Sequence, residues 1–427
     1  MPVICHEVYL AVGVMSKTLG IAIAAVSLVY ALIGQAQGAE TPRLMLNGFG
    51  TLGIVHSDED RADFTSNILV PRGAGHSSDW SAEVDSRLGL QLTAELTPRV
   101  SSVVQVIAEQ QHNGKYMPEL EWANVRFDVT PDLSLRAGRM VQSTFMSSEF
   151  RKVGYATPWI RPPLEVYRMI PVTNFDGFDA SYRSRIGEVT HTLRGTYGQA
   201  DAKFSGGEAK ARQAWGVSST LEWGAASLFG SYGGSRLSIE MAGVDTFFDA
   251  FRLYGPEGDA IADRYETHDK RFDIFSLGAS YDPGDWFVMG EWARSNSRSI
   301  IGDLRGWYVT GGYRIGAVTP YMTVARASVT SNLSDPGLSP EWWWHPEALE
   351  GAEALNEALN TWLRASARQN TLSLGARWDF APNMALTAQY DHIDIDGGSW
   401  GTLVNHQPGY EPGGTVNLFS LALDFVF

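Results

Sequence analysis

The chain has 427 residues and a formal net charge of −15 at pH 7. An acidic chain of this kind argues against nucleic-acid binding, which depends on basic side chains that release counterions. Its single cysteine, Cys5, lies in the N-terminal segment considered next, so the rest of the chain offers neither disulfides nor thiolate ligands for a metal.

The N-terminus has the features of an export signal. Lys17 precedes an apolar run from Leu19 to Ile33, and small residues suited to signal-peptidase cleavage follow. The run is shorter than the roughly 20 residues that span a bilayer comfortably. We expect residues 1–39 to be a signal peptide, with Met15 as an alternative start, and residues 40–427 to be the mature domain. An uncleaved membrane anchor is the alternative.

Alternating segments make up most of the mature chain. Short turns, such as residues 97–99 and 186–188, join some neighbours, and long polar loops join the others. Their number, about 16, is even, and both ends of the mature chain fall on the short-turn side, as in bacterial outer-membrane barrels. The strands that we expect lie at about residues 43–55, 82–96, 99–111, 119–129, 133–141, 175–185, 189–200, 211–222, 225–235, 271–282, 286–297, 304–315, 318–329, 369–380, 384–395 and 415–427.

The expected strand at residues 82–96 shows the alternation clearly. Leu88 and Leu90 lie on one face, and Arg87 and Gln91 lie on the other, because successive side chains of a strand point to opposite sides. The polar face carries charge in mid-strand, as the interior of a membrane barrel does. A soluble β-sandwich gives the same alternation and is the alternative from this pattern alone.

The connection at about residues 142–174 is too long for a simple hairpin and is rich in charge. Four prolines stiffen it, because proline fixes φ and reduces flexibility. Such a loop can hold a constant aperture if it lies inside a barrel. Its charged residues are Glu149, Arg151, Lys152, Arg161, Glu165 and Arg168.

The connection at about residues 330–368 has a helical pattern. Pro346 suits the first turn of a helix, and glutamates gather early in the pattern while arginines gather late, which complements the helix dipole. We expect a short helix that acts as a lid on the barrel mouth; a solute-binding cap or a partner surface is the alternative. The apolar residues at helical spacing are Leu349, Ala352, Leu355, Leu359, Trp362 and Leu363.

The last expected strand ends on an aromatic residue. Phe419, Leu421, Leu423, Phe425 and Phe427 fall on every second position, so one face is wholly apolar. A terminal phenylalanine inside such a strand resembles the end of outer-membrane β-barrels, in which it closes the barrel. Together with the export signal, the turn asymmetry and the strand count, it favours a membrane barrel over a sandwich.

From about residue 43 to its end, the layout of the chain resembles the general, trimeric, 16-stranded Gram-negative porins. Residues 155–167 are also similar to a segment of porin-like proteins from proteobacteria. The resemblance implies an all-β fold: a transmembrane antiparallel β-barrel with long external loops, of which one folds into the pore and one carries the helix. The acidic Pro-Glu-Phe-Gly-Gly type run of the commonest porins does not occur here.

The resemblance also implies a basic cluster on the barrel wall that faces acids on the inward loop. Parity with the apolar face turns five strand arginines inward: Arg87, Arg126, Arg136, Arg183 and Arg194. With Glu149, Glu165 and Arg161 from the loop, these form the candidate pore constriction. Our hypothesis places Arg87, Arg126 and Arg136 opposite the two glutamates, where the crossed charges would orient water and filter ions.

The alternative for each wall arginine is a purely structural ion pair. Asp85, Asp128 and Asp179 are inward-facing acids close enough in the expected layout to neutralise neighbouring arginines. In that case the arginines satisfy charges of the wall and do not select ions.

Enzyme motifs are missing from the sequence. We find no nucleophile elbow, no His-Glu-x-x-His pair and no phosphate-binding loop, so we expect no enzyme, no cofactor and no metal site. Asp391 and His392 are adjacent on an expected strand and therefore point to opposite faces, which prevents them from forming one inward dyad.

The sequence therefore predicts an outer-membrane porin for passive diffusion of small hydrophilic solutes and ions. A substrate-selective porin is one alternative, and a structural or adhesive barrel with a closed lumen is the other. The expected partners are outer-membrane lipid and lipopolysaccharide, solutes and ions, and two further copies of the chain in a homotrimer. Acidic loop residues such as Asp58 and Asp245 could bind divalent cations that bridge lipopolysaccharide, although a solvated loop is the simpler interpretation.

Overall fold

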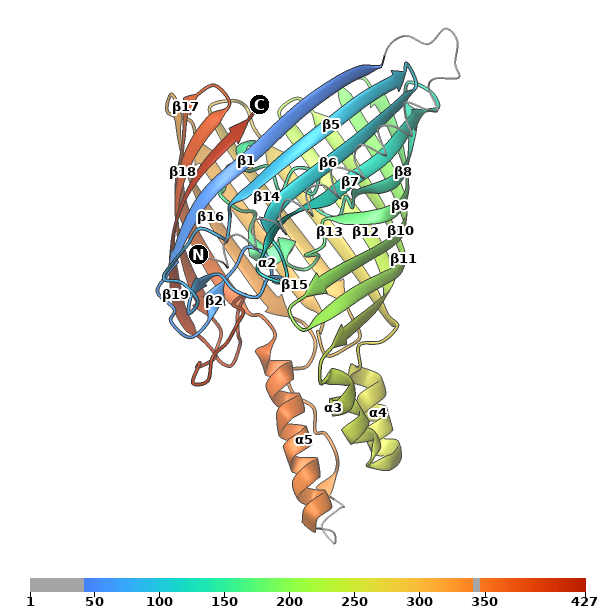
Figure 1. The fold of residues 1–427 in the computed structure, drawn as a ribbon, viewed down its shortest axis with the longest axis vertical. Helices are drawn as coiled ribbons and strands as arrows, with labels where there is room; N and C mark the ends of the chain where they lie inside the picture. The colour runs from blue at the N-terminus through green and yellow to red at the C-terminus, as the bar shows by residue number, and fades with distance from the viewer. Residues whose placement is uncertain (1–41, 341–345) are drawn as a thin grey trace, which may run out of the picture.

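A computed structural model describes residues 42–340 and 346–427. The expected signal peptide, residues 1–39, lies outside this described part. One antiparallel sheet of seventeen strands closes on itself through the pairing of β1 with β19, which makes a barrel (Figure 1). Sixteen of its strands are long, as the sequence predicts, and β4 is a two-residue addition. The long strands are β1 (Arg43–Ser57), β5 (Arg87–Thr97), β6 (Val100–Gln110), β7 (Tyr116–Asp128), β8 (Leu133–Val141), β9 (Asn174–Ile186), β10 (Val189–Phe204), β11 (Gly207–Trp223), β12 (Ala226–Met241), β13 (Lys270–Tyr281), β14 (Trp286–Asn296), β15 (Leu304–Tyr313), β16 (Val318–Val329), β17 (Gln369–Ala381), β18 (Met384–Ile395) and β19 (Gly414–Val426).

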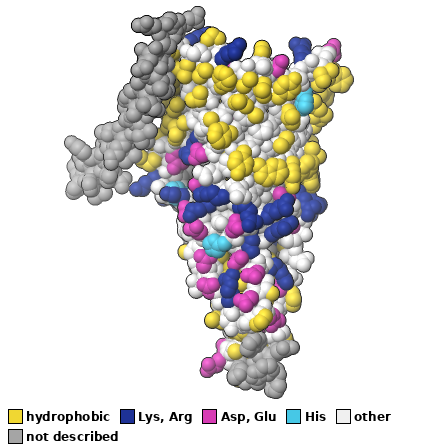
Figure 2. Space-filling model, turned by 90° about the vertical axis from the view of Figure 1, so that its right-hand side faces the viewer, with side chains coloured by type: hydrophobic (Ala, Val, Ile, Leu, Met, Phe, Trp, Pro, Cys, Tyr) yellow, Lys and Arg dark blue, Asp and Glu magenta, His cyan; other side chains and the backbone are white. Residues whose placement is uncertain are grey.

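The two faces of the barrel wall differ as the alternation predicts. Leu46 on β1 pairs with Leu92 on β5, and the outward side chains Leu46 and Phe178 are both 67% exposed. Inward positions carry polar groups such as Asp179, which is 3% exposed. Figure 2 shows apolar side chains gathered over the strands on one side of the barrel, with a band of basic side chains next to them. An apolar outer belt is the surface that lipid requires.

The seam of the barrel is built from glycines and phenylalanines. The amide of Gly48 donates to the carbonyl of Phe427 at 2.8 Å, and the amide of Phe427 donates back at 2.9 Å. A Cβ on Gly48 would lie 2.2 Å from the ring of Phe427, and one on Gly50 would lie 2.4 Å from the ring of Phe425. The two rings therefore lie directly on the backbone of β1, and the C-terminal aromatic residue closes the barrel.

Three neighbouring strands, β10, β11 and β12, are longer than the sequence indicates. We expect strands that end near residue 200 and begin again near 211, but β10 and β11 continue as a hairpin to Phe204 and Gly207. Ion pairs stabilise the extra rungs, since Lys210 lies 2.8 Å from Glu240 and Arg212 lies 2.6 Å from Asp201. Residues 201–210, which we expected to form a loop, are therefore part of a hairpin that extends the sheet.

The long loops contain the remaining short elements. Three two-residue strands, β2 (Asp63–Phe64), β3 (Ala74–Gly75) and β4 (Trp80–Ser81), lie in the connection between β1 and β5. A 3-10 turn, η1 (Gly154–Ala156), and one helical turn, α2 (Leu164–Tyr167), lie in the connection between β8 and β9.

Three helices project beyond the loop end of the barrel (Figure 1). We call α3 (Val244–Arg252), α4 (Gly255–Tyr265) and α5 (Pro346–Ala365) the helical appendage. Its core includes Phe251 and Leu359, both fully buried. The helix expected from Pro346 onward is confirmed, but it packs on α3 and extends away from the barrel, so it does not lie across the mouth as a lid.

Helices α3 and α4 were not expected from the sequence; both are short, and α4 begins at Gly255, three residues after α3 ends. Within residues 42–340 and 346–427, no helix has both the length and the apolar character needed to cross a membrane.

Candidate functional site

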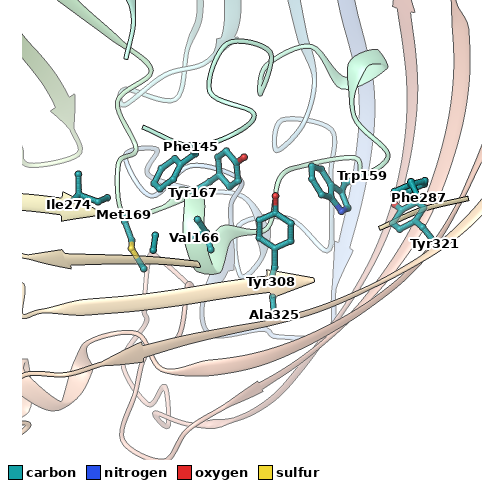
Figure 3. Packing of buried hydrophobic residues seen from close by; sticks show 11 residues of the cluster. Phe145, Trp159, Val166, Tyr167, Met169, Ile274, Phe287, Tyr308, Tyr321 and Ala325 are labelled. Carbon is teal, nitrogen blue, oxygen red and sulfur yellow. The ribbon is translucent and has the colours of Figure 1, made fainter. Parts of the chain in front are cut away.

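Residues 142–173, which we call the inner loop, turn into the barrel lumen. One side of the inner loop packs against β13 to β16 through an apolar cluster, shown in Figure 3. Trp159 and Phe145 of the loop are each 2% exposed there, and Tyr308 of β15 is 1% exposed. The rings of Trp159 and Tyr308 meet edge to face at 5.5 Å. Dry packing of this kind fixes the loop to one half of the wall.

Buried hydrogen bonds hold the same side of the inner loop. The carboxylate of Glu291 on β14 accepts from the Tyr167 hydroxyl at 2.6 Å, the Tyr308 hydroxyl at 2.8 Å and the Met146 amide at 2.6 Å. The indole Nε1 of Trp159 donates to Thr310 at 2.9 Å. These three donors satisfy the carboxylate of Glu291, although none of them is a basic side chain.

The opposite side of the inner loop is held by Arg161. Its guanidinium binds Asp85 in a bidentate manner at 3.0 and 2.6 Å, and it also reaches Asp391 at 3.1 Å and Ser420 at 2.7 Å. The Arg161 side chain is 4% exposed. Burial by itself would lower the pKa of Arg161, but the two carboxylates outweigh it and raise the pKa. The arginine is thus a charged cross-link from the loop to β18, β19 and the residues before β5.

Lys152 makes a second charged cross-link from the inner loop to the wall. Its Nζ lies 2.6 Å from Glu109 on β6 and 2.9 Å from Glu121 on β7. Burial would lower the pKa of Lys152, and the two glutamates raise it on balance. Arg377 of β17 also contacts the inner loop. It donates to the Thr157 carbonyl at 2.9 Å and lies over the ring of Tyr155 at 4.8 Å.

The inner loop therefore reaches strands on all sides of the lumen. At its start, Ser143 accepts from Arg194 on β10, and the Thr144 carbonyl accepts from Ser231 on β12 at 2.6 Å. At Gly154, an added Cβ would meet Asp424 of β19 at 2.1 Å and Thr51 of β1 at 2.9 Å. The loop is thus attached to the wall at several points around the lumen and not along one side only.

The charges across these contacts run mostly opposite to the arrangement that the sequence led us to expect. Arg161 and Lys152 place cations on the loop, and Asp85, Glu109 and Glu121 place acids on the wall. A porin-like pattern with wall arginines facing loop acids predicts the reverse polarity.

One contact follows the expected polarity. Glu149 of the loop binds Arg194, which also lies 3.2 Å from Asp179, and Arg136 binds the same aspartate at 3.0 Å. Burial would raise the pKa of Glu149, but Arg194 and then Arg136 lower it on balance. The structure thus brings together Arg136, Arg194 and Glu149 of the candidate constriction.

The other candidate residues lie apart from this group. Arg126 pairs with Asp128 at 2.8 Å and Arg183 with Glu222 at 4.0 Å, both near the short turns. Arg87 lies 3.8 Å from Glu109, on the side of Lys152.

Glu165 does not face the wall arginines. Its carboxylate accepts from Gln369 at 2.7 Å and from Thr371, both on β17. Arg126 with Asp128 and Arg136 with Asp179 form ion pairs of the kind that the structural alternative names.

Sequence reasoning missed the acids that hold the inner loop. Glu291, Asp391 and Glu109 all have inward parity on their strands, which was the available signal. Parity gives the face of a residue but not its height in the lumen or its partner. Asp391 and His392 do point to opposite faces, since Asp391 binds Arg161 inside and His392 bonds Asn417 on the outer face.

No metal cluster is evident in the described part of the chain, where no group of three or more His, Cys, Asp or Glu side chains is arranged to hold an ion. The acidic loop residues have local partners instead: Asp245 bonds His268 at 2.8 Å, and Asp249 pairs with Arg252 at 3.1 Å.

Comparisons with known proteins agree with the barrel. The family model described as Gram-negative porin matches residues 22–399. Solved structures with the same fold include the outer membrane channel DcaP of Acinetobacter baumannii, with 11% identity, coverage of 90% of this chain and 97% of that chain, and a TM-score of 0.54. Salmonella typhi OmpF in complex with daunomycin is 11% identical over 90% of this chain and 97% of its own, with a TM-score of 0.51.

A third structure, a loop L8 deletion mutant of the Vibrio cholerae outer membrane protein OmpT, is 10% identical over 91% of this chain and all of its own, with a TM-score of 0.51. At these identities the likeness shows the fold alone. A comparison with curated proteins found no match.

Proposed function

The chain belongs to the Gram-negative porin family, and from this premise we propose that the inner loop sets both the aperture and the ion preference of its channel. The protein is an outer-membrane β-barrel and a channel for passive diffusion. Its family and fold point to a channel rather than to an enzyme. The observation that carries the proposal is the ring of contacts from the inner loop to wall strands on all sides.

The solutes are small hydrophilic molecules and ions. Contacts such as Trp159 to β15 and β16, Arg161 to β18 and Lys152 to β6 attach the loop across the lumen, and we expect them to narrow it. Flux through the remaining passages depends on the size of the solute and on the fixed charges beside it. The same contacts favour one second candidate, a structural barrel whose lumen is closed by the loop.

Single-channel recording separates these two candidates. We would refold residues 40–427 and record current in a planar bilayer under a salt gradient. Stepwise openings of small conductance would support the diffusion channel, and the reversal potential would give its ion preference. A barrel that inserts stably but carries no current would leave the closed structural barrel.

We further propose that the protein is a homotrimer and that the outer face of β8 and β9 belongs to the contact between copies. Arg139 and Asp176 form a bidentate ion pair at 2.8 and 2.7 Å on this face, and each side chain is over one third exposed. Phe178, two residues from Asp176, shares the outward side. An arginine facing lipid costs up to about 2–4 kcal/mol near the bilayer midplane, whereas a partner subunit can provide polar groups.

Mass measurement of the detergent-solubilised protein tests the trimer. We expect three chains per particle, and the pair of substitutions Arg139→Gln and Asp176→Asn should shift the population toward monomer. A monomeric parent protein would refute the trimer. A trimer that is unaffected by both substitutions would place the contact on another face.

Lipopolysaccharide is the proposed lipid partner, through outward arginines at the loop end of the wall. Arg294 and Arg305 lie directly opposite each other on β14 and β15. Like charges in such pairs repel each other, so a bound anion between them would be stabilising. On the face drawn in Figure 2, basic side chains form a band between the apolar belt and the helical appendage.

Phosphate groups of lipopolysaccharide supply such anions. We expect the variant Arg294→Gln/Arg305→Gln to retain less lipopolysaccharide through purification than the parent does. The matched control is Arg314→Gln, since Arg314 pairs with Asp282 at the short-turn end. Equal retention in all three proteins would refute this assignment.

A further inference from the structure

A cavity of about 80 Å³ lies on the loop side of the inner loop. Its walls are the connection between β1 and β5, the inner loop, and the adjoining ends of β5 and β6. A cavity of this volume has room for several waters or for one small ion, since a single water needs roughly 10–15 Å³ on the same measure. Two acidic side chains, Glu83 and Glu109, line the cavity. The five basic side chains that line it are Arg87, Arg151, Lys152, Arg161 and Arg168.

Carboxylates neutralise part of this positive charge. Lys152 is held by Glu109 and Glu121, and Arg161 is held by Asp85 and Asp391. Glu83 binds Arg72, which lies outside the cavity lining, through a bidentate pair at 2.9 Å. Arg87 lies 3.8 Å from Glu109, which also serves Lys152. The acids at the cavity are therefore already engaged.

Arg151 and Arg168 differ from the other cations because their hydrogen bonds go to backbone carbonyls. Arg151 donates to the carbonyls of Ile170 at 3.0 Å and Pro171 at 3.1 Å. Arg168 donates to the carbonyl of Gly401 at 3.3 Å. Among the described residues, no carboxylate lies within ion-pair distance of either guanidinium.

These two guanidiniums have donors left for a ligand. A guanidinium has five N–H donors, and the carbonyls use two on Arg151 and one on Arg168. Burial lowers the pKa of Arg151 against the opposing effects of Glu121 and Glu109, and it lowers that of Arg168 to about 10 against the opposing effect of Glu165. Both side chains are therefore still cationic at neutral pH, and neither is directly paired with a carboxylate in the part of the chain that the structure describes.

We propose that this cavity is a binding site for a small oxyanion, in which Arg151 and Arg168 bind the charged oxygens and Arg87 completes the positive wall. The ligand class is a carboxylate or phosphate group, free or carried by a small solute, because a guanidinium fork matches the paired oxygens of either group. The site deepens the proposed function, and it rests on the proposal that the inner loop sets the ion preference of the channel. It makes the channel prefer anions although the whole chain is acidic.

The first test measures inorganic phosphate in the open channel. In a potassium chloride gradient, the reversal potential should lie toward the chloride equilibrium potential, and added phosphate should reduce the current in a saturable manner. Arg168→Gln and Arg151→Gln should each weaken the phosphate effect about tenfold, the loss of one charge-assisted contact. Arg168→Lys keeps the positive charge and should lose less, which separates loss of charge from a disturbed fold. The control is Arg212→Gln, because Arg212 pairs with Asp201 on the projecting hairpin of β10 and β11.

A second measurement tests the oxyanion site independently of the channel. Equilibrium dialysis of the intact, detergent-solubilised protein measures phosphate binding without any current. Binding in the parent that is lost in Arg168→Gln supports the site, even if the barrel carries no current and the channel proposal fails. A conducting protein that neither binds phosphate nor changes its reversal potential on Arg168→Gln would overturn the site and leave the channel intact.

Discussion

The inner loop is one long connection, the helical appendage is built from two, and these regions at the same end of the barrel are stabilised in different ways. The inner loop contains only η1 and α2, and several of its charged side chains bind residues of the wall, as Arg161 binds Asp85 and Lys152 binds Glu109. The appendage has its own apolar core around Phe251, and polar groups such as Asn360 bond within its own segments. We therefore expect changes in the inner loop to affect the lumen. Changes in the helical appendage should leave the lumen unaffected, because the appendage has its own core.

The largest expected effect breaks the charged cross-link of the inner loop. Arg161→Ala leaves Asp85 and Asp391 buried without their cation, which costs about 3–5 kcal/mol of stability for a broken buried pair. We expect a lower thermal unfolding temperature, read from the mobility shift of the folded barrel in gels. The control is Arg314→Ala, which removes a bidentate but exposed pair and should cost about 0–1 kcal/mol. Equal costs would show that the buried pair does not hold the loop.

A comparable local effect is expected in the appendage, with a different consequence. Phe251→Ala removes a fully buried ring and should cost about 3–5 kcal/mol of local stability. Proteases should then cut α3 to α5 faster, while the conductance of the barrel stays the same. A changed conductance in this variant would contradict the separation of the appendage from the lumen.

A smaller effect is expected where the inner loop meets β15 and β16. Trp159→Phe keeps an aromatic ring but loses the indole donations to Thr310 and Thr323. Those two hydroxyls still bond each other at 2.8 Å, so the cost should be only about 1–2 kcal/mol. Chemical denaturation of the variant beside its parent measures this difference. A cost as large as that of Arg161→Ala would mean that the apolar side holds the loop equally.

The smallest effect concerns pH and the appendage. Burial would raise the pKa of Asp335, but the Gly337 amide, the Tyr265 hydroxyl and Arg264 lower it on balance. Its stabilising contribution is therefore present above the ordinary aspartate pKa of about 4 and is lost as pH falls through the lowered value. Acidification should loosen α4 and α5 before the barrel, seen as a loss of helical circular dichroism. Asp335→Asn should weaken that pH dependence, and an unchanged acid transition would contradict this assignment.

The sequence predicts much of the scaffold and less of the site. The period of two gives the strands and their inward and outward faces, and the last five alternating apolar residues indicate the strand that closes the barrel; the glycines that receive its rings, Gly48 and Gly50, were not expected. The helix after Pro346 follows from apolar spacing. Arg161 is placed in the constriction by its position in a long loop that the porin resemblance turns inward.

What the sequence leaves open is which charges meet inside the lumen. Asp391 and Asp85 are hundreds of residues apart and meet at Arg161 only because the barrel closes and the loop folds back across it. The polarity of the contacts therefore depends on the path of the loop, which no local pattern contains. The short helix α3 was not expected from the sequence for a related reason. Its apolar residues pack against α5, which lies about 100 residues later in the chain.

We infer that the inner loop, held across the lumen by its wall contacts, sets the conductance. Single-channel recording of the parent beside Arg161→Ala tests this inference, with Arg314→Ala and Phe251→Ala as controls. We predict small, uniform openings in the parent and both controls, and larger or noisier openings in Arg161→Ala, because releasing the loop widens the passage. Equal conductance in all four proteins would contradict the account.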